Sequence, residues 1–338
     1  MPSPFPMTDL SAISSLAASL PCADTVAVTA ARDRQASLTK PPGSLGRLEE
    51  LAEFMAAWQA TPRPEIVKAQ ALVFAGNHGV CAQGVNPYPQ AVTAQMVANF
   101  EAGGAAINQL CKISGAELSV IALELDRPTA DFTQGPAMTD TECLAALNRG
   151  AAAVDHSASI LILGEMGIGN STVAAALANA LFDGNPSEWV GPGTGSDAAG
   201  IARKISAIAK GLSRHANLTP IATLAAFGGR EQAAICGAVL AARTLRIPVI
   251  LDGFICTAAA AVLYAIDTRL LDHCLVGHAS AEPGHRRLLA AISQRPVLDF
   301  DMRLGEGTGA ALALGILRAA LACHNGMATF AEAGVSSS

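Results

Sequence analysis

The chain lacks the patterns that indicate metal, redox or membrane chemistry. None of the eight cysteines forms a CxxC pair, and none of the seven histidines forms an HxxxH pair. No apolar run approaches about 18 residues without a glycine or polar break, and no basic segment followed by an apolar run opens the chain. We therefore expect no metal, no disulfide and no membrane span, and we expect a cytoplasmic protein with free thiols.

Charged residues are also scarce. They make up 15% of the 338 residues, hydrophobic residues make up 51%, and the net charge is -6. This charge supplies no broad attraction to nucleic acid or to an anionic membrane, so an anionic ligand must be held by a local site. So much apolar surface predicts a large core and further burial between subunits, and we expect an oligomer.

Three familiar active-site motifs are missing as well. The glycine-rich stretch GEMGIG has no GK[ST] after it, and its glycines are not spaced as in GxGxxG. No GxSxG elbow for acyl transfer occurs. The sequence therefore lacks support for a Walker loop, a dinucleotide-binding turn or a serine nucleophile.

A repeated pattern of strand, glycine turn and helix is present instead. Apolar runs of strand length occur at 68–74, 118–123, 160–163, 246–251 and 274–277. The pattern predicts an α/β fold with a doubly wound, mostly parallel sheet, helices on both faces and ligand-binding loops along one edge. We expect this Rossmann-like catalytic domain at 61–314. Residues 1–60, joined by about 315–338, are expected to form a small helical subdomain.

The stretch 296–321 has the same pattern, with a carboxylate in the turn. Alternating apolar and acidic residues predict a strand, two glycines flank Glu306, and a long alanine- and leucine-rich run predicts a helix. Loops at the carboxyl edge of a parallel sheet bind ligands, so Glu306 is a candidate catalytic residue. A carboxylate near a helix N-terminus also stabilises that helix, and the sequence leaves both functions open.

Two further turns are candidate anion sites. In GEMGIGNS the glycines allow backbone N–H groups to approach an anion, Glu165 lies on the turn, and Asn170 or Ser171 is expected to cap the next helix. The turn VGPGTGSD precedes a helix that carries Lys204. Such turns are also packing devices, and Lys204 is either a phosphate partner or a solvated residue. A carboxylate beside several anion-binding turns fits a sugar-phosphate ligand attacked at C1.

Six motifs in fixed order carry a resemblance to a known family. They are KPPGSLGRLEELA, NPYPQAVTAQMVANFEAGGAAIN, GEMGIGNSTVAAAL, VGPGTGSD, GHASAEPGH and LGEGTGAALAL, within about 38–334. The chain resembles nicotinate-nucleotide:dimethylbenzimidazole phosphoribosyltransferases, which make the lower-ligand nucleotide of cobalamin. The resemblance implies transfer of the 5-phosphoribosyl group of nicotinate mononucleotide to 5,6-dimethylbenzimidazole, by a homodimer without a cofactor. The products would be nicotinate and, with inversion at C1, α-ribazole 5′-phosphate.

The same resemblance implies roles for individual residues. Glu306 would be the general base that takes the N–H proton of dimethylbenzimidazole. Lys204, Ser280 and the glycine turns would hold the 5′-phosphate, and Glu165 would lie beside the ribose and the azole. The full set of implied substrate-binding residues is Glu165, Met166, Gly167, Gly169, Asn170, Gly193, Lys204, Ser280, Tyr88, Gln90, Gln95 and Leu304.

Two other functions remain open from the residues alone. One is a nicotinate mononucleotide glycohydrolase, in which water replaces the azole. The other is a nucleotide-binding module that uses the same turns without catalysis. The sequence also departs from the family's usual pattern at Asn77 and Asn86, where an acidic residue and a serine are commoner, and this bears on base recognition.

Overall fold

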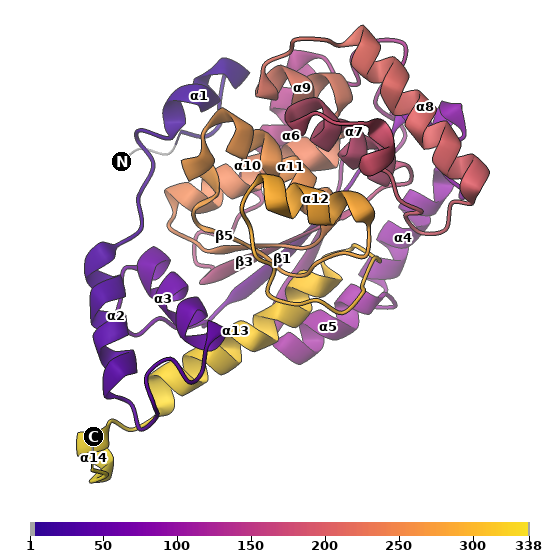
Figure 1. Cartoon of the computed structure of the whole chain (residues 1–338). Coiled ribbons are helices and arrows are strands. Elements are labelled where there is room, and N and C mark those ends of the chain that lie inside the picture. Colours follow the sequence, from indigo (N-terminus) through magenta and orange to yellow (C-terminus); the bar gives the residue numbers. More distant parts are fainter. Residues whose placement is uncertain (1–3, 337–338) are drawn as a thin grey trace.

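A computed structural model describes residues 4–336 and shows one sheet in the middle of the protein (Figure 1). Within these residues, five parallel strands pair in the order β2-β1-β3-β4-β5. The strands are β1 (Ala69–Ala75), β2 (Ala116–Ala122), β3 (Ile160–Met166), β4 (Val249–Leu251) and β5 (Cys274–Val276). The predicted doubly wound α/β fold is confirmed.

The strand order reverses beside β1. The chain runs from β1 to β2 at one edge, returns to β3 on the other side of β1, and continues outward through β4 and β5. The connections after β1 and β3 therefore leave in opposite directions and open a crevice at the carboxyl ends of these strands, where ligands bind in such folds.

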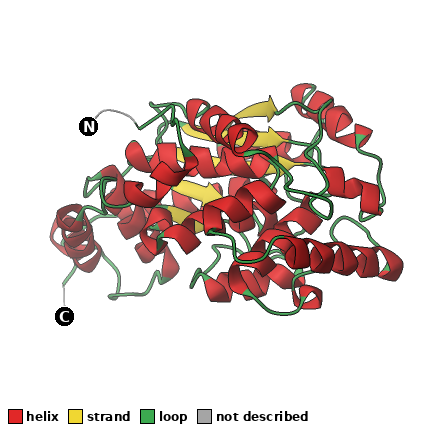
Figure 2. Cartoon of the chain, turned by 90° about the horizontal axis from the view of Figure 1, so that it is seen from above, coloured by secondary structure: helices red, strands yellow, loops and turns green. Residues whose placement is uncertain are grey.

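Helices cover both faces of the sheet (Figure 2). The α-helices are α1 (Ile13–Leu16), α2 (Thr25–Ser37), α3 (Arg47–Gln59), α4 (Ala91–Glu101), α5 (Ala106–Ser114), α6 (Asp140–Ala152), α7 (Asn170–Phe182), α8 (Ala198–Arg214), α9 (Pro220–Phe227), α10 (Arg230–Thr244), α11 (Phe254–Ile266), α12 (Pro283–Ala291), α13 (Thr308–Gly326) and α14 (Phe330–Ala333). Short 3₁₀ helices are η1 (Leu10–Ala12), η2 (Gly79–Gln83), η3 (Pro186–Glu188) and η4 (Thr268–Leu271). Among the described residues, none of these helices is both long and apolar enough to cross a membrane.

Alternate residues of the strands pack on opposite faces of the sheet. Leu72 and Leu163 contact a core that includes α6, α7, α9, α10 and α11. Val73 and Ile162 contact the core on the other face, which includes α3, α5 and α13. Strands β1 and β3 are buried along nearly their whole length, as expected where both faces of a parallel sheet are covered.

The first and last parts of the chain pack together. Arg34 of α2 donates hydrogen bonds to the carbonyls of His324, Asn325 and Met327, at 2.8, 3.2 and 3.0 Å. Helix α3 packs on both α2 and α13 (Figure 1). Because α3 also shares an apolar core with the sheet, this part is packed against the main fold. The proposed division at residues 60 and 314 remains a prediction.

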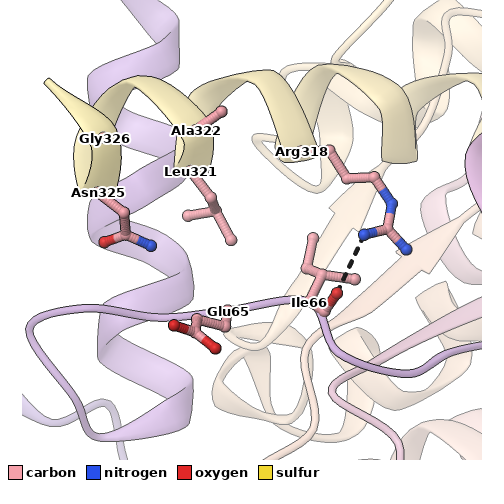
Figure 3. Close-up of a pocket in the computed structure, with 7 residues that line it drawn as sticks. All are labelled: Glu65, Ile66, Arg318, Leu321, Ala322, Asn325 and Gly326. Carbon is pink, nitrogen blue, oxygen red and sulfur yellow. Dashed lines mark hydrogen bonds between the residues drawn. The ribbon is translucent and has the colours of Figure 1, made fainter.

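The C-terminal half of α13 is anchored to the segment that leads into β1. Arg318 donates a hydrogen bond to the carbonyl of Ile66 at 3.0 Å, beside a hollow that Glu65 and Asn325 also line (Figure 3). The same guanidinium binds the carbonyls of Ser114 and Gly115. One arginine thus ties α13 to the amino ends of β1 and β2.

The predicted strand ahead of Glu306 is wrong. Residues 296–303 form one isolated parallel bridge, between Leu298 and His278, although Val297 N–H donates to the Val276 carbonyl at 2.8 Å. Phe300 is 65% exposed and Asp301 has a φ of +52°, so the segment turns away before a ladder forms. It still runs beside the end of β5 and brings Glu306 to the carboxyl edge of the sheet.

Candidate active site

A cavity of about 390 Å³ lies at the carboxyl edge of the sheet, within the usual range for small-molecule sites. The loops after β1, β3, β4 and β5 and the segment before α13 all contribute to its lining. The sequence-predicted residues that line it are Tyr88, Glu165, Met166, Gly167, Gly169, Asn170, Gly193, Lys204, Ser280, Leu304 and Glu306. The fold therefore brings together residues from five separate motifs.

Glu306 lies on a turn of unusual backbone geometry. Its φ is +63°, and the flanking Gly305 and Gly307 have φ values of +87° and +88°. The turn also packs directly on β3, since a Cβ atom at Gly164 would lie 2.6 Å from the carbonyl carbon of Glu306. A left-handed glutamate is uncommon and is maintained here by its surroundings, as is typical of functional loops.

Glu306 does not cap the helix that follows it. Helix α13 has Gly307 at its N-cap, with no side-chain cap hydrogen bond from that residue. Instead Asp252, directly after β4, accepts hydrogen bonds from the N–H groups of Gly307 and Ala310, both at 3.0 Å. The helix-cap alternative for Glu306 is therefore wrong, because another carboxylate occupies that position.

The Glu306 carboxylate is buried and has an unused oxygen. The residue is 6% exposed, and its Oε2 has no hydrogen-bond partner among the described residues. Burial, and next the charge of Asp252, raise the pKa of Glu306 to about 7. A carboxylate with this pKa changes between acid and base near neutral pH, which suits a proton acceptor.

Glu165 is a second buried carboxylate at the end of β3. It is 4% exposed, and its Oε2 accepts a hydrogen bond from Asn170 Nδ2. Burial, then the charges of Asp252, Glu231 and Glu306, raise the pKa of Glu165 well above its usual value. Burial among these acidic neighbours thus favours the protonated form of the Glu165 carboxyl.

The Asn170 side chain has a different role from the one predicted. Helix α7 begins at Asn170, and its N-cap is Gly169, without a side-chain cap hydrogen bond. The predicted cap by Asn170 or Ser171 is wrong, because the Asn170 amide turns to Glu165 instead. The N-terminus of α7 is therefore not capped by a side chain, and its dipole favours an anion in the cavity.

Lys204 does not lie on a solvated helix face. It is 3% exposed, and its Nζ lies 3.3 Å from Ser171 Oγ and 3.2 Å from the Gly191 carbonyl. Among the described residues no carboxylate oxygen lies within 4.0 Å of this Nζ, and burial lowers the pKa of Lys204 although Glu282 opposes this effect. A buried ammonium without a paired anion is suited to bind one.

Two predicted phosphate donors already have partners. The N–H of Gly193 donates to Glu282 Oε1 at 2.8 Å, and the N–H of Ser280 donates to His285 Nδ1 at 2.8 Å. Ser280 Oγ accepts from the Glu282 N–H at 3.3 Å, which leaves its own hydroxyl proton to donate. Lys204 and the N-terminal end of α7 therefore keep more capacity to bind an anion than these two N–H groups do.

Part of the cavity lining is apolar. Tyr88, Met166 and Leu304 line it as predicted, together with Val92 and Met96 of α4. Val92 and Met96 are one helical turn apart, so both face the cavity. This wall suits a flat aromatic ring.

Gln90 and Gln95 are not among the lining residues of the cavity. Gln90 donates its side-chain hydrogen bond to the His78 carbonyl, which supports the loop after β1. Gln95 is exposed, and its neighbour Met96 takes the lining position. Of the two unusual positions, Asn86 lines the cavity, whereas Asn77 donates to the Leu125 carbonyl at 2.8 Å outside it.

Sequence reasoning assigned no role to four charged or titratable residues that line the cavity: Asp252, His278, Glu282 and Arg303. The Asp-Gly turn after a strand was a usable signal for Asp252, and Arg303 directly precedes the LGEG motif. It also missed the fully buried pair of His78 and Glu231, whose Nε2 and Oε1 lie 3.1 Å apart. Nothing in the local sequence indicates that contact.

The fold and the site together define a class of protein: an α/β enzyme that binds a phosphorylated small molecule. Residues 20–335 match the family described as Phosphoribosyltransferase. The chain is 69% identical over 323 residues to a nicotinate-nucleotide:dimethylbenzimidazole phosphoribosyltransferase of Rhodobacter capsulatus, with 96% of this chain and 97% of the relative covered. A relative of the same name from Novosphingobium aromaticivorans is 60% identical, with 94% of both chains covered.

A solved structure agrees with this relationship. The crystal structure of CobT from Thermus thermophilus superimposes with a TM-score of 0.87 at 43% sequence identity, covering 93% of this chain and all of that one. The chain therefore belongs to the nicotinate-nucleotide:dimethylbenzimidazole phosphoribosyltransferase family. The family resemblance stated from its six motifs is confirmed.

Proposed function

We propose that this protein transfers the 5-phosphoribosyl group of nicotinate mononucleotide to 5,6-dimethylbenzimidazole, which yields α-ribazole 5′-phosphate and nicotinate. The observation that carries the proposal is the position of Glu306. Its unpartnered Oε2 is buried, and Glu306 shares one cavity with apolar residues such as Met166 and with the ammonium of Lys204. An aromatic base and a phosphate thus have suitable surroundings around one proton acceptor.

The chemistry requires one proton to leave the azole. Glu306 takes the N–H proton of dimethylbenzimidazole while the lone pair of the other ring nitrogen attacks C1 of the ribose. The bond from C1 to the nicotinate nitrogen breaks on the opposite face, and its electron pair neutralises the pyridinium. The β-glycosidic bond is thereby replaced by an α bond. A positioned base of this kind contributes about 10²–10⁴-fold to the rate.

The phosphate end of the substrate binds Lys204 and the N-terminus of α7. Support comes from the buried, unpaired ammonium and from the absence of a side-chain cap at Gly169. Ser280 adds a hydroxyl that can donate to the phosphate, since its oxygen accepts the Glu282 N–H and its own proton is left free. Glu165, whose pKa is raised by burial and by its acidic neighbours, lies at the same cavity and hydrogen-bonds the ribose.

A product assay separates this function from its two alternatives. The protein is incubated with nicotinate mononucleotide, with and without dimethylbenzimidazole, and nicotinate and α-ribazole phosphate are both quantified. We expect both products when the azole is present and very little nicotinate when it is absent. Equal release of nicotinate in both reactions would indicate a glycohydrolase, and binding without any release would indicate a non-catalytic module.

We also propose that the protein is a cytoplasmic homodimer. Support for an interface comes from the scarcity of charge and from exposed apolar side chains, including Ile113 at 84% and Val67 at 82% exposure. All eight cysteines are unpaired thiols, which fits a reducing compartment. Light scattering is expected to report twice the mass of the chain, and a stable monomer would contradict the dimer.

A further inference from the structure

Asp252 is a buried carboxylate at the junction of β4, β5 and α13. The residue is 1% exposed and follows the last residue of β4 directly. Its two oxygens accept the N–H groups of Gly307 and Ala310, both at 3.0 Å. These N–H groups belong to the N-cap residue and to the third residue of α13, at the end where a helix leaves its N–H donors unpaired. Asp252 therefore performs from a distant strand the capping that a nearby residue normally performs.

The neighbouring carboxylate is Glu306, two residues before the first residue of α13. The N-terminus of a helix acts like about half a positive charge, so it attracts a carboxylate and stabilises the ionised form. If Glu306 bound those N–H groups, it would be a weaker base, and its oxygens would be occupied. Because Asp252 takes them, Glu306 Oε2 stays without a partner among the described residues.

The structure explains why the two carboxylates keep these separate positions. The ring of His278 packs against Gly253, where a Cβ atom would lie 2.6 Å from its Cε1, and also against Gly309 of α13. Its Nδ1 lies 3.5 Å from Asp252 Oδ1. Glycines on both sides of this ring let the end of β4 and the start of α13 approach closely.

We propose that Asp252 is a positioning residue for the transfer reaction: it neutralises the N-terminus of α13 and so leaves the Glu306 carboxylate free to accept the azole proton. The inference rests on the proposed function. Asp252 acts through Glu306 and need not contact the substrate. The second effect of Asp252 is its negative charge, which disfavours a second charge on Glu306.

Several other charged or titratable groups face this cavity. They are Glu165 at the end of β3, His278 and Glu282 after β5, Lys204 on α8 and Arg303 on the Glu306 segment, with His78 and Glu231 buried behind Glu165. Among them His278 is also titratable: burial lowers its pKa, but Asp252 and backbone hydrogen bonds outweigh this effect and raise the pKa above its ordinary value. A test of Asp252 must therefore separate Glu306 from His278.

The test is the pH dependence of the transfer rate in Asp252→Asn. The amide keeps the size of the side chain and one acceptor oxygen but removes the charge. We expect the acid limb of kcat, near pH 7 in the wild type, to move down by about one pH unit. The plateau at high pH should fall about 3-fold because Glu306 becomes a weaker base. The matched control is Asp299→Asn, which removes an exposed carboxylate from the same region and should leave the profile unchanged.

Two further variants make the assignment to Glu306 specific. Adding Asp252→Asn to Glu306→Gln should cause no further loss of kcat, whereas an additional independent loss would show that Asp252 acts elsewhere. His278→Gln should keep an acid limb near pH 7, and its disappearance would assign the limb to His278 and overturn the inference. An unmoved limb in Asp252→Asn, with or without a lower rate, would also overturn it.

The outcome also distinguishes this inference from the proposed function. A wild-type protein that makes no α-ribazole phosphate refutes the proposed function, whereas an active wild type with an unmoved limb in the variant refutes the inference alone. If Asp252→Asn does not fold, Asp252→Ser is measured instead, because its hydroxyl keeps one acceptor for the helix.

Discussion

Replacing Lys204 by methionine removes the buried cation while it keeps most of the side-chain volume. The ammonium is 3% exposed and contacts neutral oxygens, those of Ser171 and the Gly191 carbonyl. Truncating one partner of a buried, hydrogen-bonded charge pair costs about 2–5 kcal/mol of binding free energy. A loss of about 3 kcal/mol corresponds to roughly 150-fold weaker binding of nicotinate mononucleotide. The free energy of unfolding should not fall, because the variant no longer buries a charge in the folded protein.

Calorimetric titration measures this effect with two ligands. Nicotinate mononucleotide and nicotinate riboside differ by the phosphate alone, so the affinity for the riboside should stay nearly the same in Lys204→Met. The matched control is Lys210→Met on the same helix, since Lys210 is exposed. An equal loss of affinity for both ligands would refute the phosphate assignment.

Three further predictions follow from the geometry of the site. The pKa of Glu306 is about 7 in the folded protein against an ordinary value of 4.5, so the group contributes stability below pH 4.5 that is lost as pH rises through 7. Glu306→Gln should therefore raise Tm at pH 8, because it removes a cost of at most about 3 kcal/mol. Scanning calorimetry should show a much smaller gain at pH 5. Gly164→Ala places a Cβ 2.6 Å from the Glu306 carbonyl carbon and should lower kcat at least 10-fold in a protein whose circular dichroism is unchanged. Met96→Ala should weaken binding of dimethylbenzimidazole by about 10-fold, through the loss of roughly 1–3 kcal/mol of apolar contact, whereas Gln95→Ala should leave that affinity unchanged in the same titration.

The apolar runs and the glycine turns in the sequence predicted the central strands and the loops that follow them. The apolar runs that became β1 and β3 are buried on both faces, and such runs carry a strong strand signal. The glycine turns after them lie at one edge because parallel strands end at the same side of a sheet. The position of Glu306 at the cavity follows from these two facts and from the flanking glycines.

Long-range contacts explain what the sequence did not reveal. Glu306 precedes α13 and Asn170 begins α7, so the sequence left a capping role open for each of them. In the structure Asp252 supplies the first cap from 55 residues away in the chain, and Asn170 turns to Glu165. Competition between a local and a distant carboxylate cannot be decided from spacing alone, since it depends on how β4 packs beside α13.

Alternation of apolar and acidic residues misled the prediction at 296–303. The pattern is that of a half-buried strand, and Leu298 does form a bridge with His278. Beyond it the left-handed Asp301 redirects the chain toward the cavity. Gln95 came from the motif as a whole, whereas the phase of α4 determines which side chain faces the cavity, and in this chain that side chain is Met96.

The central claim is that Glu306 accepts the azole proton, and the Glu306→Gln variant tests it most directly. The amide keeps the shape of the side chain and loses the base. Nicotinate mononucleotide should bind it as tightly as the wild type, and α-ribazole phosphate should form about 10²–10⁴-fold more slowly in a single-turnover experiment. Turnover at the wild-type rate by this variant would contradict the account.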